Sequence, residues 1–395
     1  MIHLPEIHTI SDVLPHISGR KEFAVNEKDG YNVICYNVQT ADTFSLDPND
    51  IRGSLIRREC RGILFESKTG KIISRPFQKF FNLGEKEETQ PHKIDLSSPH
   101  FIEEKIDGSL IRIFSTEPGS HLRFGTKRGE TDISAAAETF ARANLSRDFF
   151  EWAHTLVESG FTPLFEWTSP DNRIVLCYEE PKLTLLAIRE NISGEYLSRD
   201  EILQTKPSEI DLVQRCLESH HSSVHSLAEA IRGLKGEEGI VLTFPEKGFQ
   251  KIKIKSEEYC QIHSAKELIC SDRRVIVSSL KGTLDDALGI IPEEERKIAL
   301  DTEKAFWSEL KQKAEVLENL RQEIISEYGG DENFFKRVAL EWMPKKDKRT
   351  QDTMFLILKR PQLSAFDALI EKANKASIRD VTMNEFREWL EGPNV

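Results

Sequence analysis

The sequence has no long apolar run, no closely spaced cysteine pair and no excess of positive charge. Its longest apolar runs, such as RIVLCY and LTLLAI, have the length of a strand, whereas a membrane-spanning helix needs about 18 apolar residues. No basic segment followed by an apolar stretch opens the chain, so we expect no secretion signal. The six cysteines are scattered, which favours a reducing cytoplasm and argues against a zinc site. These absences predict a cytoplasmic protein without a membrane partner.

The charge balance is acidic, with a formal net charge of −12 over 395 residues. A protein that binds nucleic acid by electrostatic attraction alone is usually basic. Any contact with nucleic acid must therefore come from local basic clusters on an acidic background. Charged residues make up 30% of the chain and hydrophobic residues 38%, which is typical of a soluble globular protein. The length is sufficient for two domains.

Residues 1–264 consist mainly of short runs rich in β-branched and aromatic residues, many of them bounded by glycine, proline, asparagine or aspartate. NRIVLCYEE, at residues 172–180, is one such run. A single helical stretch at residues 132–160 interrupts the strands and ends on a glycine. Many strands joined by short turns, with few helices between them, predict an α+β domain built from antiparallel sheets.

Residues 265–395 have a different pattern and predict a helical C-terminal domain. A long helix is expected between residues 292 and 329, because proline and three glutamates favour a helix start and paired glycines favour its end. Leu310, Leu317 and Ile324 are seven residues apart and would form one apolar stripe along it.

The stretch EEKIDGSLIRIF, residues 103–114, contains the first candidate functional residue, Lys105. Asp107 and Gly108 between apolar runs are typical of a hairpin turn, in which case Lys105 would be an ordinary strand residue. Alternatively, Lys105 is a nucleophile placed beside a tight turn. The four-residue pattern alone does not decide between the two, so the remaining motifs must.

The stretch QKIKIKS contains a second candidate group. Alternate side chains of a strand point to opposite faces, so Lys251, Lys253 and Lys255 share one face, and Ile252 and Ile254 would face a core. Three adjacent ammonium groups repel one another unless they are solvated or bind an anion. The pattern therefore indicates either a solvated basic face on an edge strand or a phosphate-binding surface.

Two arginines stand among the apolar residues of RRECRGILFES. Arg58 and Arg61 could bind phosphate oxygens in a bidentate manner. The alternative is that they form salt bridges with Glu59 or Glu66.

Three further residues have both a functional and an ordinary interpretation. Lys79 precedes Phe80 and Phe81, so it is either a ligand-binding cation or a surface lysine beside core aromatics. Glu166 lies within an apolar strand and would pair with a cation or bind a hydroxyl group or a metal. Glu238 precedes a glycine and an apolar strand, where it is either functional or part of a turn. Together these residues supply a nucleophile, phosphate-neutralising cations and carboxylates, which is the set required for attack on a nucleoside triphosphate.

In sequence order, the motifs resemble those of the covalent nucleotidyltransferases, which comprise ATP-dependent ligases and capping guanylyltransferases. The set is most similar to the phage-type RNA ligase 1 family, on the strength of ECRGILFE, SRPFQKFFNL, KIDGS, FEWTSPDNRIVLCY, EEGIV and KIKS. The resemblance covers about residues 31–265. It implies a nucleotidyltransferase domain whose antiparallel sheets surround an ATP cleft.

The resemblance also implies a role for each matching residue. Lys105 matches the lysine that becomes adenylylated, and Asp107 and Gly108 complete its motif. The other matches are as follows: Tyr36, Arg61 and Lys79 contact the triphosphate, Lys127 is a further basic contact, Glu166 holds the ribose hydroxyls, Lys253 and Lys255 contact the α-phosphate, Glu238 helps to organise metal directly or through water, and Asp285 is a metal ligand. Gly125 stands where the family has another lysine.

The chemistry implied by the family requires ATP and Mg²⁺, with Mn²⁺ as a possible substitute. Lys105 would attack the α-phosphate of ATP and release pyrophosphate. AMP would then pass to a 5′-phosphate RNA end, and a 3′-hydroxyl would attack that activated end. Because a protonated lysine cannot attack, nearby cations such as Lys253 and Lys255 would favour its neutral form.

The resemblance further suggests single-stranded RNA ends as substrate, in particular broken tRNA anticodon loops. The best basic patch of the C-terminal domain, residues 344–360, is a candidate docking surface. Broken tRNA often has ends that a sealing enzyme cannot use, so a polynucleotide kinase-phosphatase is an expected partner. The chain itself has no G-x-x-x-x-G-K-[ST] motif.

Three other hypotheses compete with this one. A ligase for nicked duplexes, or a GTP-using capping enzyme, usually has a β-barrel after the lysine-rich strand, whereas helices are predicted here. A catalytically silent RNA-binding module would be expected to have lost Lys105 or the basic strand, and both are present. A structural protein would use the helical tail as a partner interface.

Overall fold

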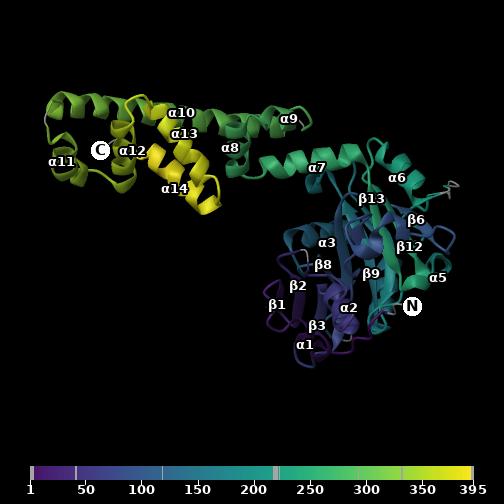
Figure 1. The fold of residues 1–395 in the computed structure, drawn as a ribbon. Coiled ribbons are helices and arrows are strands. Elements are labelled where there is room, and N and C mark those ends of the chain that lie inside the picture. The colour runs from purple at the N-terminus through teal and green to yellow at the C-terminus, as the bar shows by residue number, and fades with distance from the viewer. Residues whose placement is uncertain are drawn as a thin grey trace. The chain divides into compact units, whose positions relative to one another are not determined.

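The computed structural model describes residues 4–40, 42–117, 119–216, 221, 223–291, 293–330 and 332–392 (Figure 1). The chain divides into two compact units, Met1–Cys260 and Gln261–Val395. The division falls within a single helix, α7 (Glu257–Ile269).

The first unit contains three sheets. The first sheet has the order β1-β2-β3-β4 and is antiparallel throughout. Its strands are β1 (Phe23–Lys28), β2 (Tyr31–Tyr36), β3 (Arg61–Glu66) and β4 (Ile72–Ser74). The helices α1 (Leu14–Ile17) and α2 (Ile51–Glu59) precede β1 and β3. Ile17 and Ile56 of these helices pack with Ile34, Ile63 and Phe65 of the sheet.

The second sheet has the order β11-β10-β9-β7-β8. Its strands are β7 (Ser109–Phe114), β8 (Arg123–Gly125), β9 (Phe161–Thr168), β10 (Lys182–Glu190) and β11 (Asp211–Leu212). All pairings are antiparallel except the short contact of β10 with β11. The helix α5 (Arg199–Thr205) lies between β10 and β11 in the chain.

Two helices pack on this second sheet where the sequence predicts one. The predicted helix at residues 132–160 is divided into α3 (Asp132–Asn144) and α4 (Arg147–Glu158). Leu145 and Ser146 between them have extended backbones, and Glu209 binds both the amide and the hydroxyl of Ser146. Serine favours the start of a helix, so the chain begins a new one here.

The third sheet has the order β5-β13-β12-β6 and contains the lysine-rich strand. Its strands are β5 (Phe81–Asn82), β6 (Phe101–Glu104), β12 (Gly239–Phe244) and β13 (Gln250–Lys255), and α6 (Val224–Arg232) precedes β12. Ile252 and Ile254 are buried in a core with Leu227 of α6, as the alternation predicts. The edge-strand interpretation of β13 is wrong, because β13 lies between β12 and β5.

Two other sequence interpretations are also wrong. The hairpin at Asp107-Gly108 does not form, because β6 and β7 on either side of it belong to different sheets. The apolar run at residues 172–180 is not a strand. Its Val175 and Leu176 amides donate instead to the Asp107 carboxylate, at 2.8 and 2.7 Å, so the run folds against the K-x-D-G motif.

The second unit is helical throughout its described part. Its helices after α7 are α8 (Asp272–Lys281), α9 (Leu284–Leu288), α10 (Glu293–Tyr328), α11 (Phe334–Arg337), α12 (Lys348–Lys359), α13 (Ala365–Ala376) and α14 (Asp380–Glu391), with a π-helical turn at Val338–Trp342. Figure 1 shows α10 as the long helix against which α12, α13 and α14 pack. The predicted apolar stripe of Leu310, Leu317 and Ile324 is fully buried there. Pro292, at the predicted start of α10, lies outside the described residues.

The predicted fold class is confirmed as α+β, with mainly antiparallel sheets followed by helices. Within the described part of the chain, we find no helix long and apolar enough to span a membrane.

Candidate active site

One cavity of the first unit brings most of the predicted site residues together. It has a volume of about 320 Å³ and lies between the second and third sheets, with Leu110 and Glu166 on one side and Val241 and Lys253 on the other. Nine of the twelve residues predicted from the sequence line it: Tyr36, Arg61, Lys79, Lys105, Gly108, Glu166, Glu238, Lys253 and Lys255. We refer to this cavity as the central pocket.

The register of the third sheet explains how these side chains converge. Gly239 of β12 pairs with Lys255 of β13, and its carbonyl accepts a hydrogen bond from the Lys105 amide at 2.9 Å. One step along the sheet, Val241 pairs with Lys253 on one side and with Glu103 on the other. Residues two apart on a strand point to the same face. Lys253 and Lys255 of β13 therefore face the pocket together with Val241 and Glu103 of the neighbouring strands.

Lys105 is held by a carboxylate. Its Nζ donates to Glu238 Oε2 at 2.6 Å, and Lys255 Nζ lies 2.9 Å from Glu238 Oε1. Glu238 is 3% exposed, so this buried carboxylate neutralises two lysines at once. Besides the predicted cations Lys253 and Lys255, the structure thus places a carboxylate, Glu238, in direct contact with Lys105.

Asp107 contributes to the site by organising it rather than by lining the pocket. Its Oδ2 accepts the two amides of the 172–180 segment, and its Oδ1 accepts the Tyr259 hydroxyl at 2.7 Å. Tyr259 also lies close to Glu238, the carboxylate that holds Lys105, since burial and the Glu238 charge raise the pKa of Tyr259. Asp107 is thus connected to Lys105 through Tyr259 and Glu238.

Gly108 and Glu166 form the part of the pocket opposite Lys105. A Cβ at position 108 would lie 2.4 Å from the Trp167 carbonyl oxygen, so only glycine fits there. The same Cβ would lie 3.0 Å from Glu166 Cγ, so Gly108 and Glu166 are in close contact. Burial raises the pKa of Glu166 to about 7, although the Lys105 charge acts in the opposite direction.

The remaining cations have few counter-charges. Burial lowers the pKa of Lys253 to about 7, and the charges of Lys79, Lys105 and Lys255 add to this effect. Among the described residues, Arg61 Nη1 is buried and has no hydrogen-bond partner. This unpaired donor leaves Arg61 able to bind a water molecule or a polar ligand.

Tyr36, Lys79 and Lys127 form a group beside Arg61. The Tyr36 ring contacts both ammonium groups, with Lys79 Nζ 5.3 Å and Lys127 Nζ 4.9 Å from its centroid. Burial lowers the pKa of Lys79. Lys127 does not line the pocket. It lies next to the pocket because it contacts the ring of Tyr36, which is a lining residue.

The salt-bridge alternative for the two arginines is wrong. Arg58 pairs with Glu88 and with the Phe44 carbonyl, not with Glu59 or Glu66. Glu59 instead binds Arg75 and Arg189.

The family model for RNA ligases matches residues 59–259, which is about half of the chain. The chain belongs to the RNA ligase family. The family resemblance inferred from the motifs is thereby confirmed, and the matched segment includes Lys105, Glu166, Glu238, Lys253 and Lys255.

Individual relatives of this RNA ligase family member are distant. A protein of Thermovibrio ammonificans, provisionally assigned as an RNA ligase, is 30% identical over 264 residues, which are 65% of this chain and 64% of that protein. A provisionally assigned bifunctional polynucleotide kinase/RNA ligase of Autographa californica nuclear polyhedrosis virus is 30% identical over 64% of this chain and 38% of that protein. The chain thus spans less than two thirds of both proteins. RNA ligase 1 of bacteriophage TS2126 is 28% identical over 73% of this chain and 70% of the phage protein.

Among solved structures, an archaeal ATP-dependent RNA ligase aligns over 96% of this chain and 95% of its own, with 13% identity and a TM-score of 0.45. The family assignment therefore depends on the sequence comparisons.

Two residues of the site were not assigned by the motif analysis of this family member. Tyr259 stands in the sequence YCQIHSAKE with no pattern that marks a function, and only the fold brings it to Asp107 and Glu238. Lys251 also lines the pocket, where burial lowers its pKa to about 8 and its Nζ donates to Thr243 at 3.1 Å. Its signal was the alternation with Lys253 and Lys255, which the family motif does not use.

Proposed function

We propose that this protein is an ATP-dependent RNA ligase that joins 5′-phosphate and 3′-hydroxyl RNA ends. The observation that supports this best is the convergence of nine predicted residues, from all three sheets and their connections, on the central pocket. Six cations line that pocket together with four carboxylates, which suits a polyanionic ligand.

In the proposed first step, the Lys105 amine attacks the α-phosphorus of ATP. The new bond joins Lys105 Nζ to phosphorus, and the bond between the α-phosphorus and its bridging oxygen breaks, so that pyrophosphate leaves. Lys105 must first lose a proton, and Glu238 Oε2, at 2.6 Å, is placed to receive it. Lys253 and Lys255 would stabilise the charge that develops on the phosphate.

The apolar part of the pocket lining suits a nucleoside. Leu110, Leu186 and Val241 provide apolar side chains against which a planar base can pack. Glu166 would accept hydrogen bonds from the ribose hydroxyls. Arg61 and Lys79 would bind the β- and γ-phosphates, which satisfies the unpaired Arg61 Nη1.

The carboxylates of the pocket could hold a magnesium ion only if the substrate phosphates supplied further ligands. Among the described residues there is no group of three side chains that could hold a metal by itself. Mg²⁺ is commonly held by one or two carboxylates plus substrate phosphates, and Glu238 could supply such a carboxylate. Bound there, Mg²⁺ would neutralise phosphate charge and orient pyrophosphate as leaving group. Asp285, the other predicted ligand, belongs to α9 of the second unit and stays a prediction.

The later steps and the biological substrate follow by analogy with the family. AMP would pass from Lys105 to the 5′-phosphate of RNA, and a 3′-hydroxyl would displace it. We further propose repair of broken tRNA as the setting, with residues 1–264 as the adenylyltransferase domain and residues 265–395 as the RNA-recognition domain. The viral relative that combines kinase and ligase supports a separate kinase-phosphatase as functional partner, since this chain has no phosphate-binding loop motif.

The test is a ligation assay with a 5′-phosphorylated, 3′-hydroxyl single-stranded RNA in the presence of ATP and Mg²⁺, resolved on a denaturing gel. Circular or joined products would support the proposal. If the RNA becomes adenylylated but is not joined, the proposed reaction with ATP is supported, and the 3′-hydroxyl of this RNA is rejected as the acceptor. If the single strand is unchanged while a nicked duplex is sealed, the nicked-duplex hypothesis is correct instead.

A further inference from the structure

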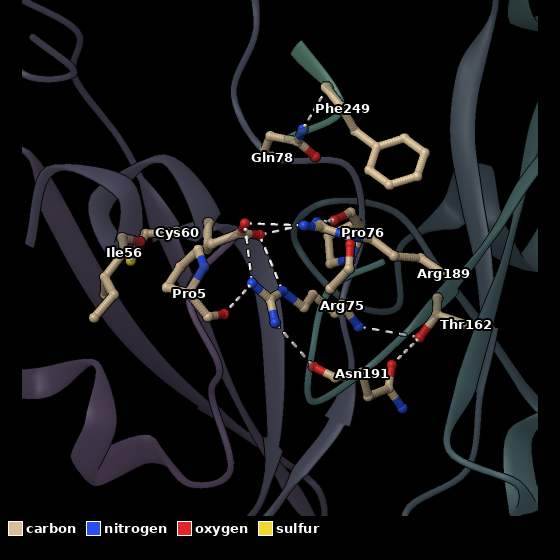
Figure 2. Close-up of polar contacts among 12 residues, drawn as sticks. Pro5, Ile56, Cys60, Arg75, Pro76, Gln78, Thr162, Arg189, Asn191 and Phe249 are labelled. Carbon is tan, nitrogen blue, oxygen red and sulfur yellow. Dashed lines mark hydrogen bonds and ion pairs between the residues drawn. The ribbon is translucent and has the colours of Figure 1, made fainter. Parts of the chain in front are cut away.

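A buried ionic cluster lies beside the central pocket, and no proposed catalytic step uses it. Its centre is Glu59, whose carboxylate binds two arginines in a bidentate manner. Arg189 Nη1 and Nη2 each lie 2.9 Å from one of its oxygens, and Arg75 Nε and Nη2 lie at 3.2 and 3.1 Å. All three side chains are at most 1% exposed. Figure 2 shows the side chains of Arg75 and Arg189, the two partners of this carboxylate, close to each other.

The cluster connects five separate parts of the chain. Arg75 donates to the carbonyls of Pro5, Asn191 and Ile192, and its amide donates to the Thr162 hydroxyl at 3.0 Å (Figure 2). Arg189 donates to the Gly194 carbonyl at 2.7 Å and to the Pro76 carbonyl. Burial acts to raise the pKa of Glu59, but Arg189 and Arg75 outweigh it and hold the pKa at about 2.

Two of these parts deliver predicted phosphate-binding cations. Glu59 is the last residue of α2, and Arg61 follows two residues later as the first residue of β3. Arg75 and Pro76 begin a segment, residues 75–80, that has neither helix nor strand structure and carries Lys79 into the pocket. Because residues 75–80 have no strand ladder, the side-chain contacts of Arg75 and Arg189 contribute to fixing the position of this segment.

Further contacts fix the end of the 75–80 segment. The Lys79 amide donates to the Arg58 carbonyl of α2 at 2.7 Å, so the segment is joined to the same helix end that carries Glu59. The Gln78 amide group donates to the Phe249 carbonyl at 3.0 Å (Figure 2). The Glu59 cluster therefore ties the Arg61 segment and the Lys79 segment to one another and to β10.

We propose that Glu59, through Arg75 and Arg189, is a positioning residue that fixes the spacing between Arg61 and Lys79 for binding the β- and γ-phosphates of ATP. This inference rests on the proposed function, because it assigns the triphosphate to those two cations. None of the three cluster residues lines the central pocket. Removing Glu59 would leave two buried guanidinium groups without their anion, and these would repel each other and displace the segments they hold.

The proposal predicts a selective loss of triphosphate binding. The experiment measures the Kd of ATP and of AMP by calorimetry, in a Lys105→Ala parent that cannot consume ATP. Glu59→Gln should weaken ATP binding by about tenfold or more, because misplaced contacts of this kind have large effects, and should change AMP binding by less than about threefold. Glu59→Asp keeps the charge but shortens the side chain, and should give an intermediate loss.

A matched control separates positioning from general destabilisation. Phe149 is fully buried in α4, away from the pocket, so Phe149→Leu lowers stability without touching either phosphate-binding segment. At a temperature where all variants are folded, this control should keep the parent ratio of ATP to AMP affinity. An unchanged ratio in Glu59→Gln, or an equal loss of ATP and AMP binding, would overturn the inference.

A second readout uses the separate steps in the protein with Lys105 intact. Glu59→Gln should slow self-adenylylation with ATP, and should seal a pre-adenylylated RNA at close to the normal rate, since that step needs no triphosphate. Equal slowing of both steps would reject a positioning role. If the parent binds no ATP and the normal chain forms no adenylate, the proposed function itself is wrong, which is distinguishable from a failure of Glu59 alone.

Discussion

The two units of this protein use charged residues in different ways. In the first unit, the charged groups around Glu59 and Lys105 are largely withdrawn from water and converge on shared partners. In the second unit, many ion pairs lie on the helix surfaces, as with Lys348 and Asp352, whose side chains are 79% and 49% exposed, and a more withdrawn pair, Arg387 with Glu309, is still 20% and 17% exposed. Similar residue types thus form a compact site in one unit and a solvated surface in the other.

This difference indicates where charge has a function. Exposed ion pairs contribute about 0–1 kcal/mol, because water solvates the partners well when they separate. Buried charges carry a desolvation cost of several kcal/mol each, so they persist only where partners or a ligand compensate them. We therefore expect substitutions of buried charge to have large and specific effects, and substitutions of the second unit's surface charge to have small ones.

The largest effect is expected at Lys105. Lys105→Ala should abolish labelling of the protein by α-labelled ATP, because no other group replaces the attacking amine. Its melting temperature should stay close to that of the normal chain. Lys304→Ala, an exposed lysine on α10, is the matched control and should label normally. A Lys105→Ala protein that still forms a covalent adenylate would sink the assignment.

Unlike Lys105→Ala, Asp107→Ala should reduce both the stability of the protein and its rate of adenylylation. Asp107→Ala removes the acceptor of two backbone amides and one hydroxyl in a buried site, which should lower the free energy of unfolding by about 1–3 kcal/mol. We also expect slower adenylylation, because Glu238 loses the support of Tyr259. Tyr259→Phe is the milder comparison, since it removes the hydroxyl and leaves the carboxylate bound to both amides. A denaturant titration that finds Asp107→Ala as stable as the normal chain would contradict this account.

The sequence predicted which residues line the pocket better than it predicted the contacts that hold these residues in place. The alternation in KIKIK was enough to place Lys251, Lys253 and Lys255 on one face, because strand geometry is local. The positions of Lys105 and Gly108 followed from the family motif. Neither source predicted the contacts of Asp107, because its partners Val175 and Tyr259 are far away in the chain and no sequence pattern links them to Asp107.

The fold errors have the same physical origin. The hairpin at Asp107-Gly108 and the strand at residues 172–180 were both reasonable from local preferences. In the structure, a long-range interaction between the two segments outweighs those preferences. Glu59 was considered only as a local partner of Arg58 or Arg61, whereas its two partners come from positions 75 and 189.

A moderate effect is expected from pH, through Glu166 and Lys253. Below pH 7, Glu166 becomes protonated and is a poorer acceptor for the ribose hydroxyls. Above pH 7, Lys253 loses its charge and attracts phosphate less. The affinity for ATP should therefore be bell-shaped, with a maximum near pH 7. Calorimetric titrations of the normal chain between pH 5.5 and 9 measure this, with an ATP analogue whose α–β bridge cannot be cleaved. Lys105 is kept because its charge contributes to both pKa values. We expect a change in affinity of about tenfold across each limb.

Single substitutions identify the group behind each limb. Glu166→Gln cannot titrate and should flatten the acidic limb, whereas Lys253→Arg stays charged and should flatten the alkaline limb. If both limbs persist in both variants, other groups control the pH dependence.

The smallest effect is expected in the second unit. Of the six bases in residues 344–360, three are paired in the structure: Lys348 with Asp352, Arg349 with Glu385 and Arg360 with Glu371. These pairs reduce the net positive charge of the predicted docking surface, although exposed pairs can open to receive phosphate at little cost. Reversing Lys345, Lys346 and Lys348 to glutamate should weaken ligation of broken tRNA, and the loss should be larger at low salt. Self-adenylylation needs no RNA and should be unchanged.

The matched control reverses the same number of charges elsewhere in the same unit. Lys297, Lys304 and Lys311 are exposed on α10, where acidic residues surround them. If the 344–360 surface binds RNA through position and not merely through net charge, reversing the α10 lysines should reduce tRNA ligation less than reversing the other three. Equal losses in the two variants would mean that only the overall charge matters. Loss of adenylylation together with ligation would show that the second unit's surface charge affects the active site, and the contrast between the two units would then fail.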